Sequence, residues 1–159
     1  MADIFSVKKR SQIMSRIRSR GTSPELRLES LVRSLLPRHH SIQIHPANIS
    51  GTPDIFVPSL RLAIFLDGCF FHRCPVHGHI PKSNRAYWKK KIERNCQRDM
   101  GTRRQLRAHG YAVWRLWEHQ LKTKSQLQRT RDILRKRLIK LRKIIDKEHV
   151  LPHPSLSSS

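Results

Sequence analysis

The sequence predicts a small mixed α/β domain, in which a few buried strands are flanked by helices. Its 159 residues suit one domain of ordinary size with short tails. Short apolar runs typical of strands lie in the middle of the chain, and longer segments with helical spacing precede, separate and follow them. The formal net charge is +22, yet residues 41–81 hold two basic and two acidic residues. The pattern therefore indicates a neutral core enclosed by basic elements.

The first elements are a helix and a hairpin. Thr22-Ser23-Pro24-Glu25 has the features of a helix start: a hydroxyl cap, a proline in the first turn and an acid near the positive end of the helix dipole. Pro37 ends this helix, and residues 41–45 then alternate polar with apolar as in a short strand. Residues 54–57 and 60–66 are apolar runs separated by a Pro-Ser turn, which predicts a hairpin of buried strands. The apolar side of the helix consists of Leu26, Leu28, Leu31, Leu35 and Leu36.

Two further helices enclose the last strand. A long polar helix begins after Ser83-Asn84 and reaches about Ala108, where Gly110 ends it. Residues 111–117 (YAVWRLW) are rich in β-formers and predict a third core strand. Residues 120–148 predict a basic amphipathic helix, whose apolar side holds Leu127, Leu134, Leu138, Leu141 and Ile145.

We therefore predict one domain over residues 1–150 with three parts. These are a basic N-terminal helical region (1–40), a core (41–119) and a basic C-terminal helix (120–148), and the Pro/Ser-rich residues 151–159 form a disordered tail. No apolar run approaches the roughly 20 residues of a transmembrane helix, and the N-terminus lacks the apolar stretch of a signal peptide. Three cysteines cannot form a fully paired disulfide framework. We expect a cytoplasmic protein without a membrane partner.

The net charge points to a polyanionic partner. The chain has 33 Lys and Arg residues against 11 Asp and Glu residues, whereas ordinary solvated surfaces mix the two signs. Nucleic acid is the leading candidate, ahead of an anionic membrane surface or a ribosome.

A loop rich in cysteine and histidine predicts a zinc site. Cys69, Cys74 and His77 are local candidates for tetrahedral ligands, and His119 after the third strand is the best placed fourth ligand, with His79 as its substitute if the loop closes differently. His72 is not needed by such a site, so it is available for another role. The adjacent Phe70 and Phe71 either stand outward, where they could stack on bases, or pack in the core.

The acidic residues of the neutral centre predict a magnesium site. Asp54 opens one strand of the predicted hairpin and Asp67 closes the other, so both lie at the end of the hairpin opposite its turn. Mg²⁺ favours one or two carboxylates together with water and phosphate oxygens. The pattern of Pro-Asp, strand, turn, strand and Asp is the layout of restriction-type nucleases, although their final lysine is missing. The other interpretation makes Asp54 a turn residue.

Taken together, the motifs resemble those of the very short patch repair (Vsr) DNA mismatch endonucleases. The resemblance runs from about Arg10 to Leu121 and is carried by several motifs in the same order. They are RSQIMSRIRSRGTSPELRL, GTPDIFVP, IFLDGCFFHRCPVHG, PKSNRAYWKKKIERNCQRD and VWRLWEH. The resemblance implies a restriction-endonuclease-like core, which is a mixed central sheet flanked by helices, with a structural zinc site.

The resemblance also implies roles for individual residues. Asp54 matches the family's magnesium-binding aspartate, His72 its catalytic histidine, Asp99 an active-site acid and Glu25 an acid of the N-terminal helix near the site. The backbone of Leu66 and the carboxylate of Asp67 stand where some members carry Thr-His, and both become candidate magnesium ligands. The zinc positions are Cys69, Cys74, His77 and His119, and the aromatic residues expected to insert into the duplex are Phe70, Phe71 and Trp88.

The function that the resemblance implies is strand-specific nicking of duplex DNA beside the T of a T·G mismatch, the product of 5-methylcytosine deamination. Mg²⁺ is the expected catalytic cofactor and Zn²⁺ the structural one. We expect a functional link to a cytosine-5 methyltransferase and to mismatch-repair proteins in a bacterial cell, and a monomer suffices for one nick. The alternatives are a zinc-stabilised nucleic-acid-binding module without catalysis and a nuclease of broader mismatch or restriction specificity.

Overall fold

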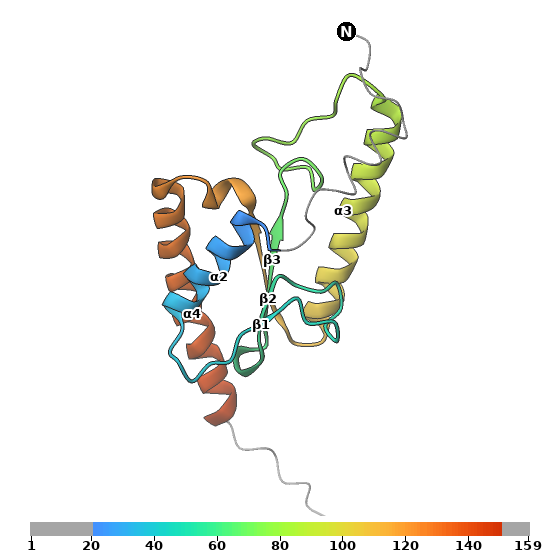
Figure 1. Cartoon of the computed structure of the whole chain (residues 1–159). Coiled ribbons are helices and arrows are strands. Elements are labelled where there is room, and N and C mark those ends of the chain that lie inside the picture. The colour runs from blue at the N-terminus through green and yellow to red at the C-terminus, as the bar shows by residue number, and fades with distance from the viewer. Residues whose placement is uncertain (1–20, 151–159) are drawn as a thin grey trace, which may run out of the picture.

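The computed structural model describes residues 21–150, in which three helices cover the two faces of a four-stranded sheet (Figure 1). Residues 1–20 of the predicted helical region (1–40) and the predicted tail at 151–159 lie outside the described residues. The elements, in chain order, are α2 (Ser23–Leu35), β1 (Gln43–Ile44), β2 (Ile55–Val57), the 3₁₀ turn η1 (Pro58–Leu60), β3 (Leu62–Asp67), α3 (Arg85–Ala108), β4 (Ala112–Trp117), the 3₁₀ turn η2 (Glu118–Leu121) and α4 (Lys124–Val150).

The sheet has the order β1-β2-β3-β4 and is mixed. β1, β2 and β3 are antiparallel neighbours, with Ile55 opposite Ile64, and this confirms the predicted hairpin. β4 pairs with β3 in parallel, because α3 carries the chain back across the sheet before β4 begins. The start of β2 and the ends of β3 and β4 consequently lie next to one another at one end of the sheet.

The two faces of the sheet bury different side chains because successive strand residues point to opposite sides. Ile55, Leu62 and Ile64 face α2 and α4, and they form the larger core with Leu28, Leu134 and other apolar residues of those helices. On the opposite face, the smaller core consists of Ile49, Phe56, Ala63, Leu106 and Val113. α3 thus forms one outer layer, and α2 with α4 forms the other (Figure 1).

Three details differ from the sequence-based expectation. Leu26 is 57% exposed, because it lies about 200° around the helix from Leu28 and so points away from the core. The first strand is only two residues long and both are exposed. The last helix begins at Lys124 rather than at residue 120, because the 3₁₀ turn η2 first carries the chain away from β4. Among the described helices, none combines the length and the apolar character needed to cross a bilayer.

Candidate active site and metal centre

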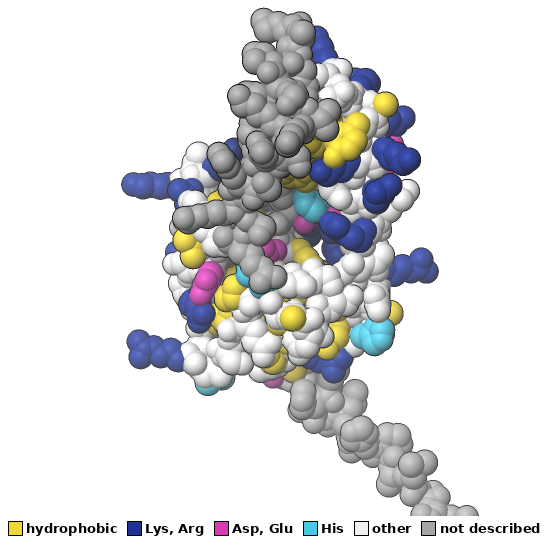
Figure 2. Space-filling model, turned by 45° about the vertical axis from the view of Figure 1, so that its right-hand side comes forward, with side chains coloured by type: hydrophobic (Ala, Val, Ile, Leu, Met, Phe, Trp, Pro, Cys, Tyr) yellow, Lys and Arg dark blue, Asp and Glu magenta, His cyan; other side chains and the backbone are white. Residues whose placement is uncertain are grey.

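A polar cleft of about 680 Å³ lies between α3 and the end of the sheet where β2 begins and β3 ends. Both carboxylates predicted from the acidic centre, Asp54 and Asp67, line it, together with three residues that the resemblance implied: Leu66, His72 and Asp99. The full lining consists of Gly51, Thr52, Asp54, Phe65, Leu66, Asp67, His72, Arg98, Asp99, Thr102 and Arg103. On the face shown in Figure 2, Lys and Arg side chains gather along the side where α3 lies.

Asp54 lies at the entrance of β2 with its carboxylate directed toward the end of β3. Its Oδ2 accepts a hydrogen bond of 2.7 Å from the backbone N–H of Leu66. Burial raises the pKa of the Asp54 carboxyl, although this hydrogen bond and the nearby His45 oppose the shift. A half-buried carboxylate with one oxygen already bonded is held in a fixed orientation, which suits a ligand that must meet a cation at a defined point.

Glu25 reaches the same site from α2. His45 Nε2 lies 3.3 Å from Glu25 Oε2, and the candidate ligand atoms of Glu25, His45 and Asp54 all lie within 4.8 Å of one another. The backbone N–H of His45 donates to the Asp54 carbonyl over 3.4 Å, so the contact is made by main chain and side chain together. His45 has φ = 46°, a left-handed conformation that is uncommon outside glycine. The predicted position of Glu25 near Asp54 is therefore observed, with a histidine between them.

The loop before Asp54 is pressed against α3. Gly51 has φ = 75°, and a Cβ added to it would lie 2.2 Å from the Thr102 side chain. Only glycine fits this approach without displacing the loop or the helix. The close packing fixes the cleft wall that carries Asp54 relative to the helix that carries Asp99.

His72 and Asp99 form a pair across the cleft. His72 Nδ1 lies 2.5 Å from Asp99 Oδ2, while Asp67 Oδ1 lies 3.9 Å from the same nitrogen. β4 and α3 hold the backbone of this histidine as well. The His72 carbonyl accepts hydrogen bonds from Arg115 Nη2 (3.1 Å) and from the Cys96 thiol (3.6 Å). With Nδ1 engaged by a carboxylate, Nε2 is the nitrogen left for a reacting group.

Asp67 has different neighbours from those we expected. The hairpin places it at the same edge as Asp54, but its carboxylate belongs to a separate group with His72 and Asp99. It forms an ion pair with Arg115, and Arg103 Nη1 lies 3.7 Å from the same oxygen. The reason is strand alternation: Asp67 points to the α3 face, as do Phe65 and Ala63, where both arginines lie. The described geometry thus gives Asp67 cationic partners and leaves Asp54 as the carboxylate without an arginine.

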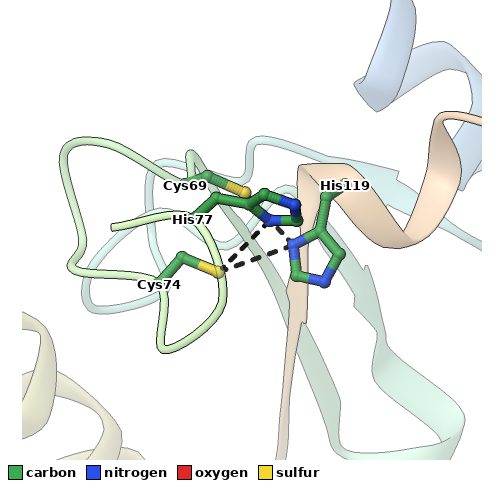
Figure 3. Close-up of side chains that lie close together, drawn as sticks. All are labelled: Cys69, Cys74, His77 and His119. Carbon is green, nitrogen blue, oxygen red and sulfur yellow. Dashed lines mark hydrogen bonds between the residues drawn. The ribbon is translucent and has the colours of Figure 1, made fainter. Parts of the chain in front are cut away.

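A second group of potential ligands lies behind the cleft, where the loop after β3 meets the end of β4. Cys69, Cys74, His77 and His119 point toward one another, with all four ligand atoms within 4.8 Å (Figure 3). His119 Nδ1 is 3.2 Å from the Cys69 sulfur and 3.5 Å from the Cys74 sulfur, and His77 Nδ1 is 4.0 Å from the Cys74 sulfur. His79 is exposed and directs Nδ1 to the His77 carbonyl instead.

These separations fit a tetrahedral metal ion with sulfur and nitrogen ligands. Zinc bonds of about 2.3 Å to sulfur and about 2.0–2.1 Å to nitrogen place the two ligand atoms about 3.5 Å apart. Both sulfurs are removed from solvent, since Cys69 is 8% and Cys74 1% exposed. A closed set of two thiols and two imidazoles is the donor chemistry of a structural zinc site.

The titration of these ligands follows their surroundings. Burial raises the pKa of the Cys69 thiol, and the neighbouring Cys74 adds to the effect. Burial also acts to raise the pKa of the Cys74 thiol, but backbone N–H donors around it outweigh burial, so that this pKa lies below its usual value. Burial, supported by His77, lowers the pKa of His119 and so favours the neutral imidazole that can bind a metal.

The three aromatic residues predicted to insert into DNA form one cluster above the cleft. The Phe70 ring lies 5.0 Å from the rings of both Phe71 and Trp88, in edge-to-face contacts. Phe70 and Phe71 are half-buried, which lies between the two alternatives of outward and core positions, whereas Trp88 is only 8% exposed. In the free chain Trp88 packs against both phenylalanines. Its exposed neighbour is Tyr87.

Sequence reasoning missed three residues of the site: His45, Arg103 and Arg115. Arg115 could have been found, since it is a charged residue inside the apolar strand YAVWRLW and such a residue requires a partner. Arg103 is one of many basic residues on α3, and nothing in the sequence distinguishes it. His45 lies next to a two-residue strand, far from Glu25 in sequence, and only the fold brings them together.

A cleft that combines carboxylates, a carboxylate-held histidine and arginines at the edge of a mixed sheet is typical of enzymes that cleave phosphodiester bonds. The comparisons with known proteins define the class further. The family model described as "DNA mismatch endonuclease Vsr" matches residues 2–77. The chain belongs to this family of Vsr DNA mismatch endonucleases.

Relatives support this membership along most of the chain. The DNA mismatch endonuclease Vsr of Escherichia coli is 33% identical over 132 residues, covering 80% of this chain and 80% of that protein. The "Type II nicking enzyme V.XorIIP" of Xanthomonas oryzae pv. oryzae is 38% identical over 137 residues, covering 84% of this chain and 98% of the relative. The "Type II nicking enzyme V.NmeAIP" of Neisseria meningitidis is 38% identical over 128 residues, covering 79% and 88%. The predicted resemblance is thereby confirmed, and a binding module without catalysis is disfavoured.

Proposed function

We propose that this chain nicks one strand of duplex DNA beside the T of a T·G mismatch, by Mg²⁺-dependent hydrolysis of a phosphodiester bond. The observation that carries the proposal is the single cleft in which Asp54 faces the pair formed by His72 and Asp99. One side of the cleft offers the half-buried carboxylate of Asp54 for a cation, and the other offers a histidine for proton transfer. Arg98 and Arg103 line the same cleft, where they can attract a phosphate.

Asp54 and the backbone of Leu66 are the groups that we assign to Mg²⁺. The N–H of Leu66 points to Asp54, and in an extended strand the C=O of a residue points to the same edge as its N–H. A carboxylate and a carbonyl leave room for water and phosphate oxygens, the set that Mg²⁺ prefers. When bound, the ion neutralises charge on the scissile phosphate and makes the attacking water more acidic.

His72 is the proposed general base or acid. Since Asp99 accepts from Nδ1, the opposite ring nitrogen, Nε2, can take a proton from the attacking water or return one to the leaving oxygen. Asp99 orients the ring and stabilises its protonated form, as a carboxylate does for a catalytic imidazole.

We assign Asp67 a different role from the one the sequence suggested. Its ion pairs with Arg115 and Arg103 both engage Oδ2, which suits Asp67 to hold Arg115, and Arg115 in turn donates to the His72 carbonyl. Glu25, held by His45 beside Asp54, is placed to bind water around the metal.

Zinc at Cys69, Cys74, His77 and His119 is the proposed structural cofactor. The donor set and its separations fit the ion. His72 lies between the first two of these ligands in sequence, so a metal that fixes the loop also fixes the histidine.

The aromatic cluster is the proposed mismatch sensor. Insertion of Phe70, Phe71 and Trp88 between base steps costs the least where pairing and stacking are already weakened, so a mismatch is favoured over paired DNA. The Phe70 and Phe71 rings would have to swing outward to expose Trp88, which the free chain covers. Lys90, Lys91 and Arg94 line a surface hollow beside Tyr87 on the same helix and can hold the flanking phosphates.

The proposal extends to the origin of the substrate. A T·G mismatch arises when 5-methylcytosine is deaminated, which links the enzyme to a cytosine-5 methyltransferase and to mismatch-repair proteins. One active site makes one nick, so a monomer suffices.

The test is cleavage of labelled 30-bp duplexes that differ only in one pair, T·G against T·A. We expect a nick beside the mismatched T with Mg²⁺, none when Mg²⁺ is omitted, and none with Asp54→Ala, whose DNA affinity is expected to stay near that of the wild type. Measurable cleavage by Asp54→Ala would contradict the assignment of this carboxylate.

The same assay separates the broader alternative. Several relatives are named type II nicking enzymes, so the preference for mismatched over paired DNA needs a test separate from that of nicking itself. Equal cleavage of the T·A duplex would favour a nuclease of broader specificity, with the same cleft and cofactors.

A further inference from the structure

A line of positive charge runs along the outward face of α4, on the side of the molecule away from the cleft. Residues 124–150 contain ten Lys and Arg residues against three Asp and Glu residues. Its apolar side is buried against the sheet by residues such as Leu134 and Leu138. The face turned to solvent carries a row that we call the α4 stripe, formed by Arg129, Lys136, Lys140, Lys143 and Lys147.

The stripe follows from the helical repeat. Its members lie at i, i+7, i+11, i+14 and i+18, which keeps them within about 60° of one another around the helix and extends them over about 27 Å. All five side chains are exposed, and they lie roughly opposite Leu134, which is 1% exposed. Asp132 and Asp146 border the stripe on one side, and the exposed Ile133 and Ile144 border it on the other.

The stripe and the cleft belong to different layers. The cleft lies between the sheet and α3, whereas α4 packs on the opposite face of the sheet (Figure 1). The sheet and α4, each about 10 Å thick, therefore separate the stripe from the proposed site of cleavage. One duplex could contact both only by bending sharply over a short length, which costs several kcal/mol for about 20–30 bp.

We propose that the α4 stripe binds a second segment of duplex DNA while the cleft holds the first. A straight row of flexible cations matches a row of phosphates, and lysine binds phosphate as a point charge without needing a shaped pocket. The partner is the polyanion that the family already acts on, and a DNA-bound enzyme meets other segments of the same molecule at high local concentration. Such a second contact lets the enzyme pass between segments while it searches for a mismatch.

The experiment measures bridging of two short duplexes without cleavage. A 20-bp paired duplex is fixed to beads, a labelled 20-bp T·G duplex is added in buffer without Mg²⁺ or chelator, and the protein is kept below the concentration of either duplex. We expect the wild type to retain the labelled duplex, and Lys136→Gln/Lys140→Gln/Lys143→Gln to retain at least tenfold less. The charge-preserving control, Lys136→Arg/Lys140→Arg/Lys143→Arg, should bridge as the wild type does.

Two further measurements distinguish this contact from the first. Affinity for a single T·G duplex and nicking with Mg²⁺ should change less than about twofold in the glutamine variant, because the stripe does not contact that duplex. The salt dependence of bridging should weaken by about 0.9 in logarithmic slope for each lysine removed.

Several results would overturn the proposal. They are bridging that survives in the glutamine variant, an equal loss of single-duplex affinity in that variant, and a wild type that does not bridge. Stripe-dependent binding to phosphatidylserine vesicles without bridging would replace DNA by a membrane surface. Bridging is measured without Mg²⁺, so a chain that bridges but does not nick would contradict the proposed function alone.

Discussion

The Cys/His cluster and the carboxylate cleft share one edge of the sheet but differ in each property that selects a metal. The cluster offers two buried thiols, with Cys74 1% exposed, and two imidazoles, of which His77 is exposed to solvent. The cleft offers carboxylate and carbonyl oxygens in an open space of about 680 Å³ lined by arginines. Soft donors in a closed set suit a permanent structural ion, and hard donors in an open set suit an ion that shares its ligands with a phosphate.

The comparison also shows how the two sites depend on each other. The loop that supplies Cys69 and Cys74 carries His72 between them, and His72 completes the cleft through Asp99. The dependence runs in one direction. Loss of the cluster should disturb the cleft, whereas loss of a cleft side chain should leave the cluster intact.

The largest effect is expected from Cys69→Ser. Structural zinc contributes on the order of 10 kcal/mol to folding in small metal domains, so removal of one ligand should release the metal and lower the melting temperature by about ten degrees or more. Nicking should fall with it, because His72 loses its support. Zinc content by a chelator dye and melting by circular dichroism provide the measurement.

Cys96→Ser is the matched control for this variant. Cys96 lies on α3 outside the cluster, and its thiol contacts only the backbone carbonyl of His72 among the described hydrogen bonds. It should keep its zinc and nearly all of its stability. A Cys69→Ser protein with normal metal content and melting would show that the cluster is not a zinc site.

The second effect concerns the cleft alone. Asp99→Asn removes the charge that stabilises protonated His72 while keeping the size of the side chain, so nicking of the T·G duplex should fall by about 10²–10³-fold. Zinc content and melting should stay close to those of the wild type. Single-turnover nicking is the measurement, with Asp132→Asn, an exposed carboxylate of α4, as the control. Metal loss in Asp99→Asn would break the one-directional dependence.

The fold and the Cys/His cluster can be predicted well from the sequence because local patterns encode both. Alternating and continuous apolar runs indicate the hairpin and β4, and the close spacing of Cys69, Cys74 and His77 identifies three of the four ligands of the cluster. The partners of Asp67 could not be predicted in this way. Arg115 and Arg103 come from two later elements, and their meeting depends on strand register and on the placement of α3.

The aromatic cluster is a second feature whose packing the sequence does not predict. The sequence contains Phe70, Phe71 and Trp88 at the positions of the family's inserting aromatic residues, but the tertiary packing decides which of these rings covers another. Trp88 is one of the few apolar residues of a polar helix, which favours its burial, but its packing against Phe70 and Phe71 cannot be deduced from the sequence of that helix.

The third prediction tests that cluster. Trp88→Ala should reduce the ratio of nicking on T·G to nicking on T·A duplexes by about tenfold, because stacking of an aromatic ring on a base contributes about 1–3 kcal/mol. The ratio is the right measurement, since a smaller fraction of folded enzyme lowers both rates equally. Tyr87→Ala, a change at the exposed neighbouring ring, is the control and should leave the ratio unchanged. An unchanged ratio in Trp88→Ala would argue against insertion of this residue.

The smallest effect is expected in the layer formed by α2 and α4, at a position away from the cleft, and it concerns stability. His40 lies in the loop between α2 and β1. Its Nδ1 is 2.6 Å from the hydroxyl of Ser59 in η1, and its ring contacts that of His39. Burial lowers the pKa of His40, and the neighbouring His39 and Arg142 lower it further. The unfolded chain therefore binds a proton here at a higher pH than the folded chain, and the contribution of neutral His40 is lost as the pH falls below about 6.5 and through the folded-state pKa.

His40→Gln removes this titration and keeps a polar group beside Ser59. As the pH is lowered from 7.5 to 5, the melting temperature of the wild type should fall more steeply than that of the variant, so any advantage of the wild type shrinks. His109→Gln, at an exposed position after α3, serves as the control and should leave the slope unaltered. Zinc content should be unchanged throughout, because His40 packs on the α4 side of the sheet, away from the metal ligands. Parallel melting curves for wild type and His40→Gln over this range would show that His40 does not contribute to the acid sensitivity of the α2–α4 layer.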